Sequence, residues 1–167
     1  MNTSAAALTF YTHPMSRGRT ARWMLEECGV PYDTVLLEYG TTMKASDYLA
    51  INPMGKVPAL QHGDVVITET AAILAYLADL FPEKKLAPPV NDPARGSYYR
   101  WLFFVAGPVE AATTARSEGW LKAQTHQQAM SAGFGRFEDV VSTLRQAVGG
   151  KRHVCGEGFT AADLYLA

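Results

Sequence analysis

Two neighbouring residues, Val57 and Pro58, stand inside a strand-like pattern in a way that suits ligand binding. A proline there removes a ladder donor, so it belongs at an edge strand, at a strand start or in a cis peptide bond. An edge strand that ends at this proline leaves the Val57 amide and carbonyl free to pair with an extended, peptide-like ligand. The structural alternative is that Pro58 only shapes a turn.

Glu69 and Thr70 stand where a strand gives way to a helix. The free N–H groups of the helix N-terminus, its dipole and the Thr70 hydroxyl would hold a carboxylate, and the Glu69 carboxylate would hold an ammonium group. A ligand with an α-amino acid end needs that combination. The structural alternative is an N-cap at Thr68 or Thr70, with Glu69 as a first-turn acid that compensates the dipole.

Ser16 precedes another predicted helix, and its hydroxyl has two interpretations. As an N-cap it serves folding alone. At the ligand-facing end of a sheet, beside a positive helix terminus, the same hydroxyl would stabilise a thiolate. Arg17, Arg19 and Arg22 crowd the first turns of this helix, which the helix dipole disfavours. They either face water or indicate an anion nearby.

A mixed sheet with helices packed on it would position these residues. The periodicity predicts two strands joined by a helix, which implies a parallel pair with a right-handed crossover. A hairpin and another helix follow, so the order βαβ and then ββα makes a four-stranded mixed sheet. The predicted strands are 8–11, 32–38, 57–61 and 65–68, and the predicted helices are 16–28, 45–49 and 70–81.

The rest of the chain is predicted to be helical. Residues 86–93 are proline-rich and form a linker, so we expect one domain over 1–85 and an all-helical domain over 94–167. One helix begins at Ala94 and bends or breaks at Gly107–Pro108, and a second covers 127–148. Their apolar stripes, which we assign to the core of a bundle, are Tyr98, Trp101, Leu102 and Val105 in the first and Phe134, Phe137, Val141, Leu144 and Val148 in the second.

The last residues predict the start of one more helix. Thr160 and Asp163 have the spacing of a capping box, and Phe159 stands at the staple position. The apolar helix that follows stops after about one turn. We therefore expect the helical domain to be incomplete and to continue beyond Ala167.

Composition excludes several classes of function. The 167 residues include 15 basic and 16 acidic side chains, and a net charge of −1 gives no basic excess for nucleic-acid binding. No apolar run is long enough for a bilayer, and the N-terminus lacks the regions of a signal peptide. Cys28 and Cys155 are too few and too distant for a disulfide framework or a metal site, so we expect a reducing cytoplasm and no metal.

Four segments together resemble the glutathione S-transferase superfamily over nearly the whole chain: YTHPMSRGRTARWMLEECGVPY, INPMGKVPAL, VITETAAILAYL and FTAAD. The specific part of the resemblance is NPMGKVPAL with ETAAI. It implies a thioredoxin-like domain that binds glutathione, an all-helical second domain and a homodimer. FTAAD is similar to the family's capping-box and staple signature, whose role is folding.

The resemblance also implies roles for residues of this chain. Val57, before a cis Pro58, would pair its backbone with the cysteinyl part of glutathione. Glu69 and Thr70 would bind the γ-glutamyl end. The family more often has Ser where Thr70 stands, which keeps the hydroxyl.

A cation and a thiol-activating residue complete the implied site. Lys44 or Lys56 would meet the glycyl carboxylate of glutathione. Members of the superfamily activate the thiol with a Tyr, Ser or Cys near the end of the first strand. Ser16 is the residue we expect here, with Tyr11 and His13 as alternatives. This region has no Cys and no Cys-x-x-Cys pair, which argues against disulfide chemistry.

In the implied mechanism, Ser16 donates a hydrogen bond to the sulfur of glutathione. A free thiol with a pKa of about 8.5 is a few per cent ionised at neutral pH, and lowering that pKa by about two units makes most of it thiolate. The thiolate attacks an electrophilic small molecule, with Arg17 or Arg19 assisting the charge. We therefore predict a glutathione transferase. The alternatives are a glutathione-dependent isomerase of the maleylacetoacetate type and a non-catalytic binding protein with the same fold.

Overall fold

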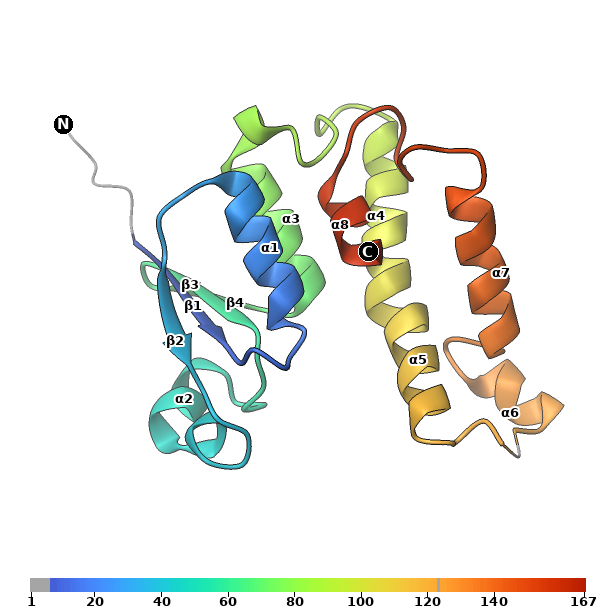
Figure 1. Cartoon of the computed structure of the whole chain (residues 1–167), viewed down its shortest axis with the longest axis horizontal. Helices are drawn as coiled ribbons and strands as arrows, with labels where there is room; N and C mark the ends of the chain where they lie inside the picture. The colour runs from blue at the N-terminus through green and yellow to red at the C-terminus, as the bar shows by residue number, and fades with distance from the viewer. Residues whose placement is uncertain (1–6, 123) are drawn as a thin grey trace. The chain divides into compact units, whose positions relative to one another are not determined.

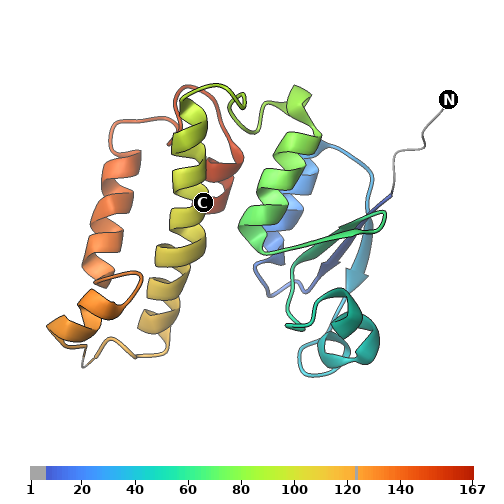
Figure 2. The same cartoon turned by 180° about the vertical axis from the view of Figure 1, so that it is seen from behind.

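The computed structural model describes residues 7–122 and 124–167, and the chain divides into two compact units, one up to Lys84 and one from Lys85. Residues 1–6, which the sequence analysis assigns to the first domain, lie outside the described residues. The first unit is a sheet with helices, and the second is helical (Figures 1 and 2). Within the described ranges, no helix is both long and apolar enough to cross a membrane.

The first unit contains the four-stranded mixed sheet that the sequence predicts, in the strand order β2-β1-β3-β4. β1 (Leu8–Thr12) pairs in parallel with β2 (Asp33–Leu36) and antiparallel with β3 (Ala59–His62), and β3 pairs antiparallel with β4 (Val65–Thr68). β3 is therefore a central strand. The interpretation of Pro58 as part of an edge strand is wrong, and the residue precedes the start of β3 instead.

Two helices, α1 (Gly18–Cys28) and α3 (Thr70–Leu80), lie side by side against the sheet (Figure 1). Gly29, with φ 63°, closes α1 as the sequence predicts. Cys28 is fully buried, and burial raises the pKa of its thiol to about 11, so the thiol is neutral at neutral pH. The fully buried apolar side chains of this unit include Phe10, Met24, Leu25, Leu60, Ile73, Leu74 and Leu77.

The start of α1 differs from the prediction. Arg17, not Ser16, is the N-cap, and the helix begins at Gly18. The Ser16 hydroxyl still accepts a hydrogen bond from the Gly18 amide at 3.0 Å. A serine that precedes a helix by two residues can therefore satisfy a first-turn amide without being the N-cap residue.

Short helices connect β2 to β3. A 3₁₀ turn (Thr42–Lys44) leads into α2 (Ser46–Ile51), slightly later in the chain than the predicted helix at 45–49. A buried cluster of Leu37, Met43 and Tyr48 anchors this segment, and Tyr11 and Val57 pack against the cluster.

The second unit opens with a helix that bends at Gly107–Pro108. α4 (Ala94–Phe104) passes through a π-helical turn (Val105–Val109) into α5 (Glu110–Ser117), so the proline distorts the helix without ending it. The predicted core stripe of this helix is confirmed, because its members are at most 4% exposed: Tyr98, Trp101, Leu102 and Val105.

The single helix predicted at 127–148 is wrong. The structure has two helices, α6 (His126–Ser131) and α7 (Phe137–Val148). Gly135, between them, has a φ of 68°, a left-handed conformation that does not continue a right-handed helix. A capping box of Thr125 and Gln128, which the sequence analysis did not identify, starts α6.

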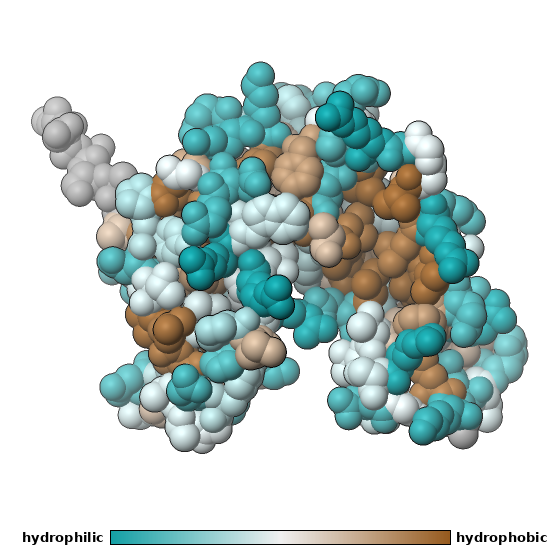
Figure 3. All heavy atoms as spheres, in the orientation of Figure 1, coloured by the Kyte–Doolittle hydropathy of each residue, from teal (hydrophilic) through white to brown (hydrophobic). Residues whose placement is uncertain are grey.

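The buried stripe of α7 also differs from the prediction. Val140 and Ala147 are its buried residues, whereas Val148, which was assigned to the stripe, is 55% exposed. Apolar atoms gather on the visible face of this unit over α4, α8 (Ala161–Leu166) and α7 (Figure 3).

The capping box that opens α8 is confirmed. Asp163 Oδ2 accepts hydrogen bonds from Thr160 N at 2.9 Å and from Thr160 Oγ1 at 2.8 Å. Asp163 Oδ1 accepts another from Val154 N at 2.7 Å. One carboxylate thus ties the start of α8 to the preceding turn.

Asp163→Asn is expected to lower the free energy of unfolding by about 1–2 kcal/mol. The substitution replaces one carboxylate oxygen by an amide nitrogen, which cannot accept the hydrogen bonds made by that oxygen. Urea denaturation measures the loss. Asp139→Asn is the matched control, because that carboxylate is exposed and pairs with Arg136 at the surface. Equal stability of Asp163→Asn and the wild type would contradict this role.

Candidate functional site

The turn between β1 and α1 is organised around Ser16. The Ser16 amide and hydroxyl both donate to the His13 carbonyl, at 3.0 and 2.7 Å. The same hydroxyl accepts from the Gly18 amide, so its one proton and one of its lone pairs are engaged. If the hydroxyl turns toward a ligand, the His13 carbonyl keeps the Ser16 amide as a donor. The hydroxyl can therefore be redirected without leaving a carbonyl unpaired.

Gly18 allows α1 to start in contact with β1. A Cβ at this buried position would overlap Thr12 Oγ1 and would lie 2.9 Å from Ser16 Oγ. Thr12 is the last residue of β1 and is itself buried. The sequence analysis missed Gly18, although a glycine in the first turn of a helix is itself a signal, because it disfavours the helix unless close packing requires it.

The side chains of the other two candidates for thiol activation have partners of their own. The Tyr11 hydroxyl donates to Gln61 Oε1 at 2.9 Å, and its ring packs against Tyr48 with centroids 5.6 Å apart. His13 lies in the turn itself, and its Nδ1 accepts from the Met15 amide at 3.1 Å. Of the three candidates, Ser16 is the one whose hydroxyl contacts the first turn of α1.

Asn52 shapes the loop that leads to Val57. Its buried side chain donates from Nδ2 to the Lys56 carbonyl at 2.8 Å and accepts at Oδ1 from the Met54 amide at 3.1 Å. The Tyr48 hydroxyl donates to the same Lys56 carbonyl. The peptide group just before Val57 is therefore fixed from two sides. The sequence analysis did not single out Asn52, but Asn before Pro is a turn signal that would have identified it.

Val57 presents its backbone and buries part of its side chain. The Val57–Pro58 peptide bond is cis, as the resemblance implied. The Val57 side chain packs against the Leu37, Met43 and Tyr48 cluster. In the part of the chain that the structure describes, neither its amide nor its carbonyl has a hydrogen-bond partner, because pairing of β3 begins at Ala59. Both groups can therefore pair with an extended ligand.

The two candidate lysines differ in their surroundings. Lys44 Nζ donates to the Met54 carbonyl at 2.9 Å, so its ammonium group is held against the loop that precedes Val57. Lys56 is exposed, and its carbonyl is held by Asn52. Lys44 is thus the one with a fixed position.

Glu69 has an unusual backbone conformation at the start of α3. It is exposed, and its φ of 66° and ψ of 124° are uncommon for a residue other than glycine. Such a conformation costs about 1–3 kcal/mol and is typical of functional sites. No side chain caps α3, so its first-turn amides are available to an anion beside the buried Thr70.

The strand register brings Ser16, Val57 and Glu69 to one end of the sheet. Ala59 lies opposite Tyr11 in β1 and opposite Thr68 in β4. Because β3 runs antiparallel to both neighbours, the end of β1, the start of β3 and the end of β4 coincide. Ser16 follows the first of these points, Val57 precedes the second, and Glu69 follows the third.

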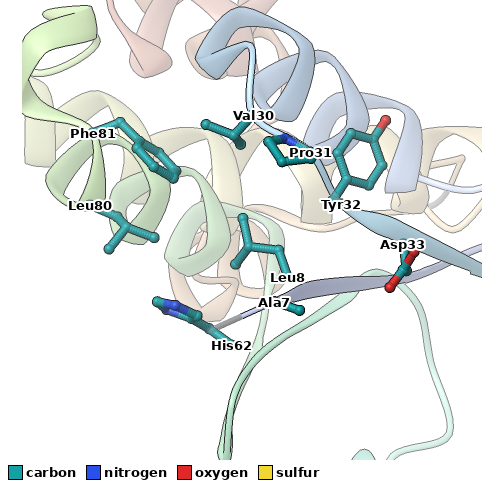
Figure 4. A pocket seen from close by; sticks show the side chains of 9 residues that line it. All are labelled: Ala7, Leu8, Val30, Pro31, Tyr32, Asp33, His62, Leu80 and Phe81. Atoms are coloured by element: carbon teal, nitrogen blue, oxygen red, sulfur yellow. The ribbon is translucent and has the colours of Figure 1, made fainter. Parts of the chain in front are cut away.

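A cavity of about 440 Å³ lies at the other end of the same unit, where Leu8 begins β1 opposite His62 (Figure 4). Its walls also include Tyr32 and Phe81, and none of the candidate site residues lines it. Over the described residues, no group of three His, Cys, Asp or Glu side chains is placed to hold a metal ion.

The sheet, with its cis proline before β3, defines a thioredoxin-like domain, and an all-helical unit follows it. The model of the family described as glutathione S-transferase, N-terminal domain, matches residues 6–79. A glutathione transferase homologue from Sulfitobacter, solved with bound glutathione, is 30% identical with a TM-score of 0.71, and the match covers 96% of this chain and 79% of that one. The chain belongs to the glutathione S-transferase superfamily.

Other relatives agree with this assignment. The glutathione transferase from Methylococcus capsulatus is 28% identical with a TM-score of 0.78, over 96% of this chain and 79% of that one. Glutathione S-transferase GstA from Escherichia coli O157:H7 is 33% identical over 121 residues, which are 72% of this chain. That match spans 58% of the length of GstA.

Proposed function

We propose that this protein is a glutathione transferase that converts the thiol of glutathione into a thiolate for attack on an electrophilic small molecule. The observation that supports it most directly is the convergence of three ligand-binding features at one end of the sheet. These are the Ser16 hydroxyl, the unpaired backbone of Val57 and the strained Glu69 at the uncapped start of α3.

The proposed ligand contacts follow from the chemistry of each feature. The Val57 amide and carbonyl, before Pro58, pair with the backbone of the cysteinyl residue. Glu69 binds the ammonium group of the γ-glutamyl residue, and Thr70 with the first-turn amides of α3 binds its carboxylate. A lysine, Lys44 or Lys56, binds the glycyl carboxylate.

The proposed chemistry begins with loss of the thiol proton to solvent. Ser16 Oγ turns from the His13 carbonyl and donates its hydrogen bond to the sulfur, which favours the thiolate. The thiolate then forms a carbon–sulfur bond at the electrophile. The electron pair leaves with the departing group or, in an addition, becomes a carbanion that takes a proton from water.

We also propose that the protein is a homodimer, as the resemblance implies, and that it is cytoplasmic, as its two distant cysteines suggest. Light scattering on the purified protein tests the dimer by its mass. A monomer at micromolar concentration would contradict it.

Binding to immobilised glutathione and turnover of a chloronitrobenzene substrate test the proposed function. Retention with turnover supports the transferase. Retention without turnover of several such electrophiles favours the isomerase of the maleylacetoacetate type, a peroxidase or a transferase with an unusual substrate. No retention contradicts glutathione binding and favours a non-catalytic binding protein.

Glu69→Ala is expected to raise the Kd for glutathione about tenfold to a hundredfold, because a hydrogen bond to a charged group contributes about 1.5–3 kcal/mol. Calorimetry measures the Kd. Lys85→Ala is the matched control, because Lys85 is the other exposed non-glycine residue of the described chain with positive φ, at 56°. Equal affinities of Glu69→Ala and Lys85→Ala would show that Glu69 does not bind the ligand.

A further inference from the structure

The side chain of His13 joins the turn after β1 to the segment after β2. It is 15% exposed, and its Nε2 lies 3.5 Å from Glu38 Oε2. The ring of Tyr39 flanks it, with centroids 4.4 Å apart. The backbone of Glu38 is held in turn, because its amide donates to Thr42 Oγ1 at 2.7 Å and its carbonyl accepts from the Met43 amide at 3.2 Å, whereas its carboxylate is largely exposed.

The two ring nitrogens of His13 have different partners. The Met15 amide donates to Nδ1 at 3.1 Å, so Nδ1 carries no proton. The proton of the neutral imidazole is therefore on Nε2, the nitrogen that faces Glu38. The Glu38 carboxylate favours the tautomer with the proton on Nε2. In that tautomer Nδ1 is free to accept the hydrogen bond from the Met15 amide.

The same residue fixes Ser16 through its main chain. The His13 carbonyl accepts from both the amide and the hydroxyl of Ser16. Pro14 has no amide, so the Met15 and Ser16 amides are the backbone donors of residues 14–16, and both bond to His13. The position of the Ser16 hydroxyl thus depends on the side chain and the carbonyl of one residue.

We propose that His13 is a positioning residue for thiol activation, a role that rests on the function proposed above. It does not touch the sulfur. It holds the turn 13–16 in the one conformation in which Ser16 Oγ, released from the His13 carbonyl, donates to the bound thiol. Glu38 supports this role by setting the tautomer of His13.

Substitutions of His13 and Glu38 distinguish the contact of His13 with the Met15 amide from its contact with Glu38. His13→Ala removes both the acceptor of the Met15 amide and the partner of Glu38. His13→Asn restores the first of these, because an asparagine oxygen accepts from the amide two residues later, as in an Asx turn. Glu38→Gln keeps an oxygen near Nε2 but removes the negative charge, whereas Glu38→Ala removes both.

The pKa of the thiol in the glutathione complex, followed by thiolate absorbance, tests this proposal. His13→Ala is expected to raise that pKa by about one unit and to lower kcat/KM at neutral pH by about threefold at most, because the thiolate fraction falls from about three quarters to about one quarter. The Kd of S-methylglutathione, which has no thiol to ionise, is expected to stay unchanged. His13→Asn and Glu38→Gln are expected to behave nearly as the wild type. His126→Ala is the control, because His126 is exposed at the start of α6.

Two results would overturn the proposal. The first is an equal rise of the thiol pKa in His13→Ala and His13→Asn. The second is a parallel loss of S-methylglutathione affinity in His13→Ala, which would indicate a general disturbance of the site.

Hydrogen exchange of the Met15 and Ser16 amides distinguishes failure of this proposal from failure of the proposed function, because it needs no ligand. Exchange is expected to be faster in His13→Ala and near the wild-type rate in His13→Asn. Unchanged exchange in His13→Ala contradicts the positioning role. A wild-type protein that leaves the thiol pKa at its free value contradicts the proposed function instead.

Discussion

Ser16→Ala is expected to raise the pKa of the glutathione thiol in the complex by about two units, to the value of a free thiol near 8.5. At neutral pH the thiolate fraction then falls from most of the bound glutathione to a few per cent. The loss of thiolate is about 25-fold, but a thiolate whose pKa is about two units higher is about sixfold to tenfold more nucleophilic. The rate of conjugation at neutral pH is therefore expected to fall about threefold to fourfold. The pH dependence of kcat/KM and the thiolate absorbance of the complex both measure the shift.

Two variants control for the packing of the turn. Ser16→Thr keeps the hydroxyl and is expected to retain most of the activation. Ser131→Ala removes an exposed serine hydroxyl that donates to the Gln127 carbonyl in α6, and it is expected to leave the thiol pKa unchanged. If Ser16→Ala also leaves that pKa unchanged, the Ser16 hydroxyl serves only the turn, as its bonds to His13 and Gly18 in the absence of ligand would allow.

The features that the sequence predicted well are local ones. The hairpin strand at Val65–Thr68 and the stop of α1 at Gly29 each depend on a few adjacent residues. The capping box of Thr160 and Asp163 is of the same kind. Short-range patterns of this sort have a physical cause within one turn of chain, so a single sequence is enough to identify them.

The features that the sequence analysis missed depend on residues that are distant along the chain. The partner of His13 is Glu38, and the atom that excludes a Cβ at Gly18 belongs to Thr12 of the preceding strand. The central position of β3 depends on pairing with β1, about fifty residues earlier, and no local signal states that pairing. The break between α6 and α7 does have a local signal, Gly133 and Gly135, but the prediction followed the apolar periodicity and did not use the glycines.

The register explains why the site could be predicted in parts but not as a whole. Ser16, Val57 and Glu69 each had a structural alternative in the sequence. The pairing of Ala59 with both Tyr11 and Thr68 places all three at one end of the sheet. Each of these three features has a sufficient structural explanation when it is considered alone. Their convergence at one place is therefore a stronger argument for a bound ligand than any single feature.

Gly18→Ala is expected to have the largest combined effect on stability and activity. The new methyl group would overlap Thr12 Oγ1 and lie 2.9 Å from Ser16 Oγ. Thr12 is buried and β-branched, so its side chain has little freedom to turn away. The start of α1 must therefore shift, at a cost of about 1–3 kcal/mol in the free energy of unfolding. The Ser16 hydroxyl shifts with it, and a displaced donor is expected to reduce thiol activation as strongly as Ser16→Ala does.

Two further variants isolate the cause. Gly96→Ala is the matched control, because Gly96 is an exposed helical glycine with no atom within 4 Å of an added Cβ. It is expected to raise the free energy of unfolding by up to about 1 kcal/mol through helix propensity. Thr12→Ala combined with Gly18→Ala removes the overlapping hydroxyl, so it is expected to recover activity relative to Gly18→Ala alone. Urea denaturation and kcat/KM measure both effects. A Gly18→Ala protein with wild-type stability and activity would show that α1 does not need its close contact with Thr12, and that the position of Ser16 is set by His13 alone.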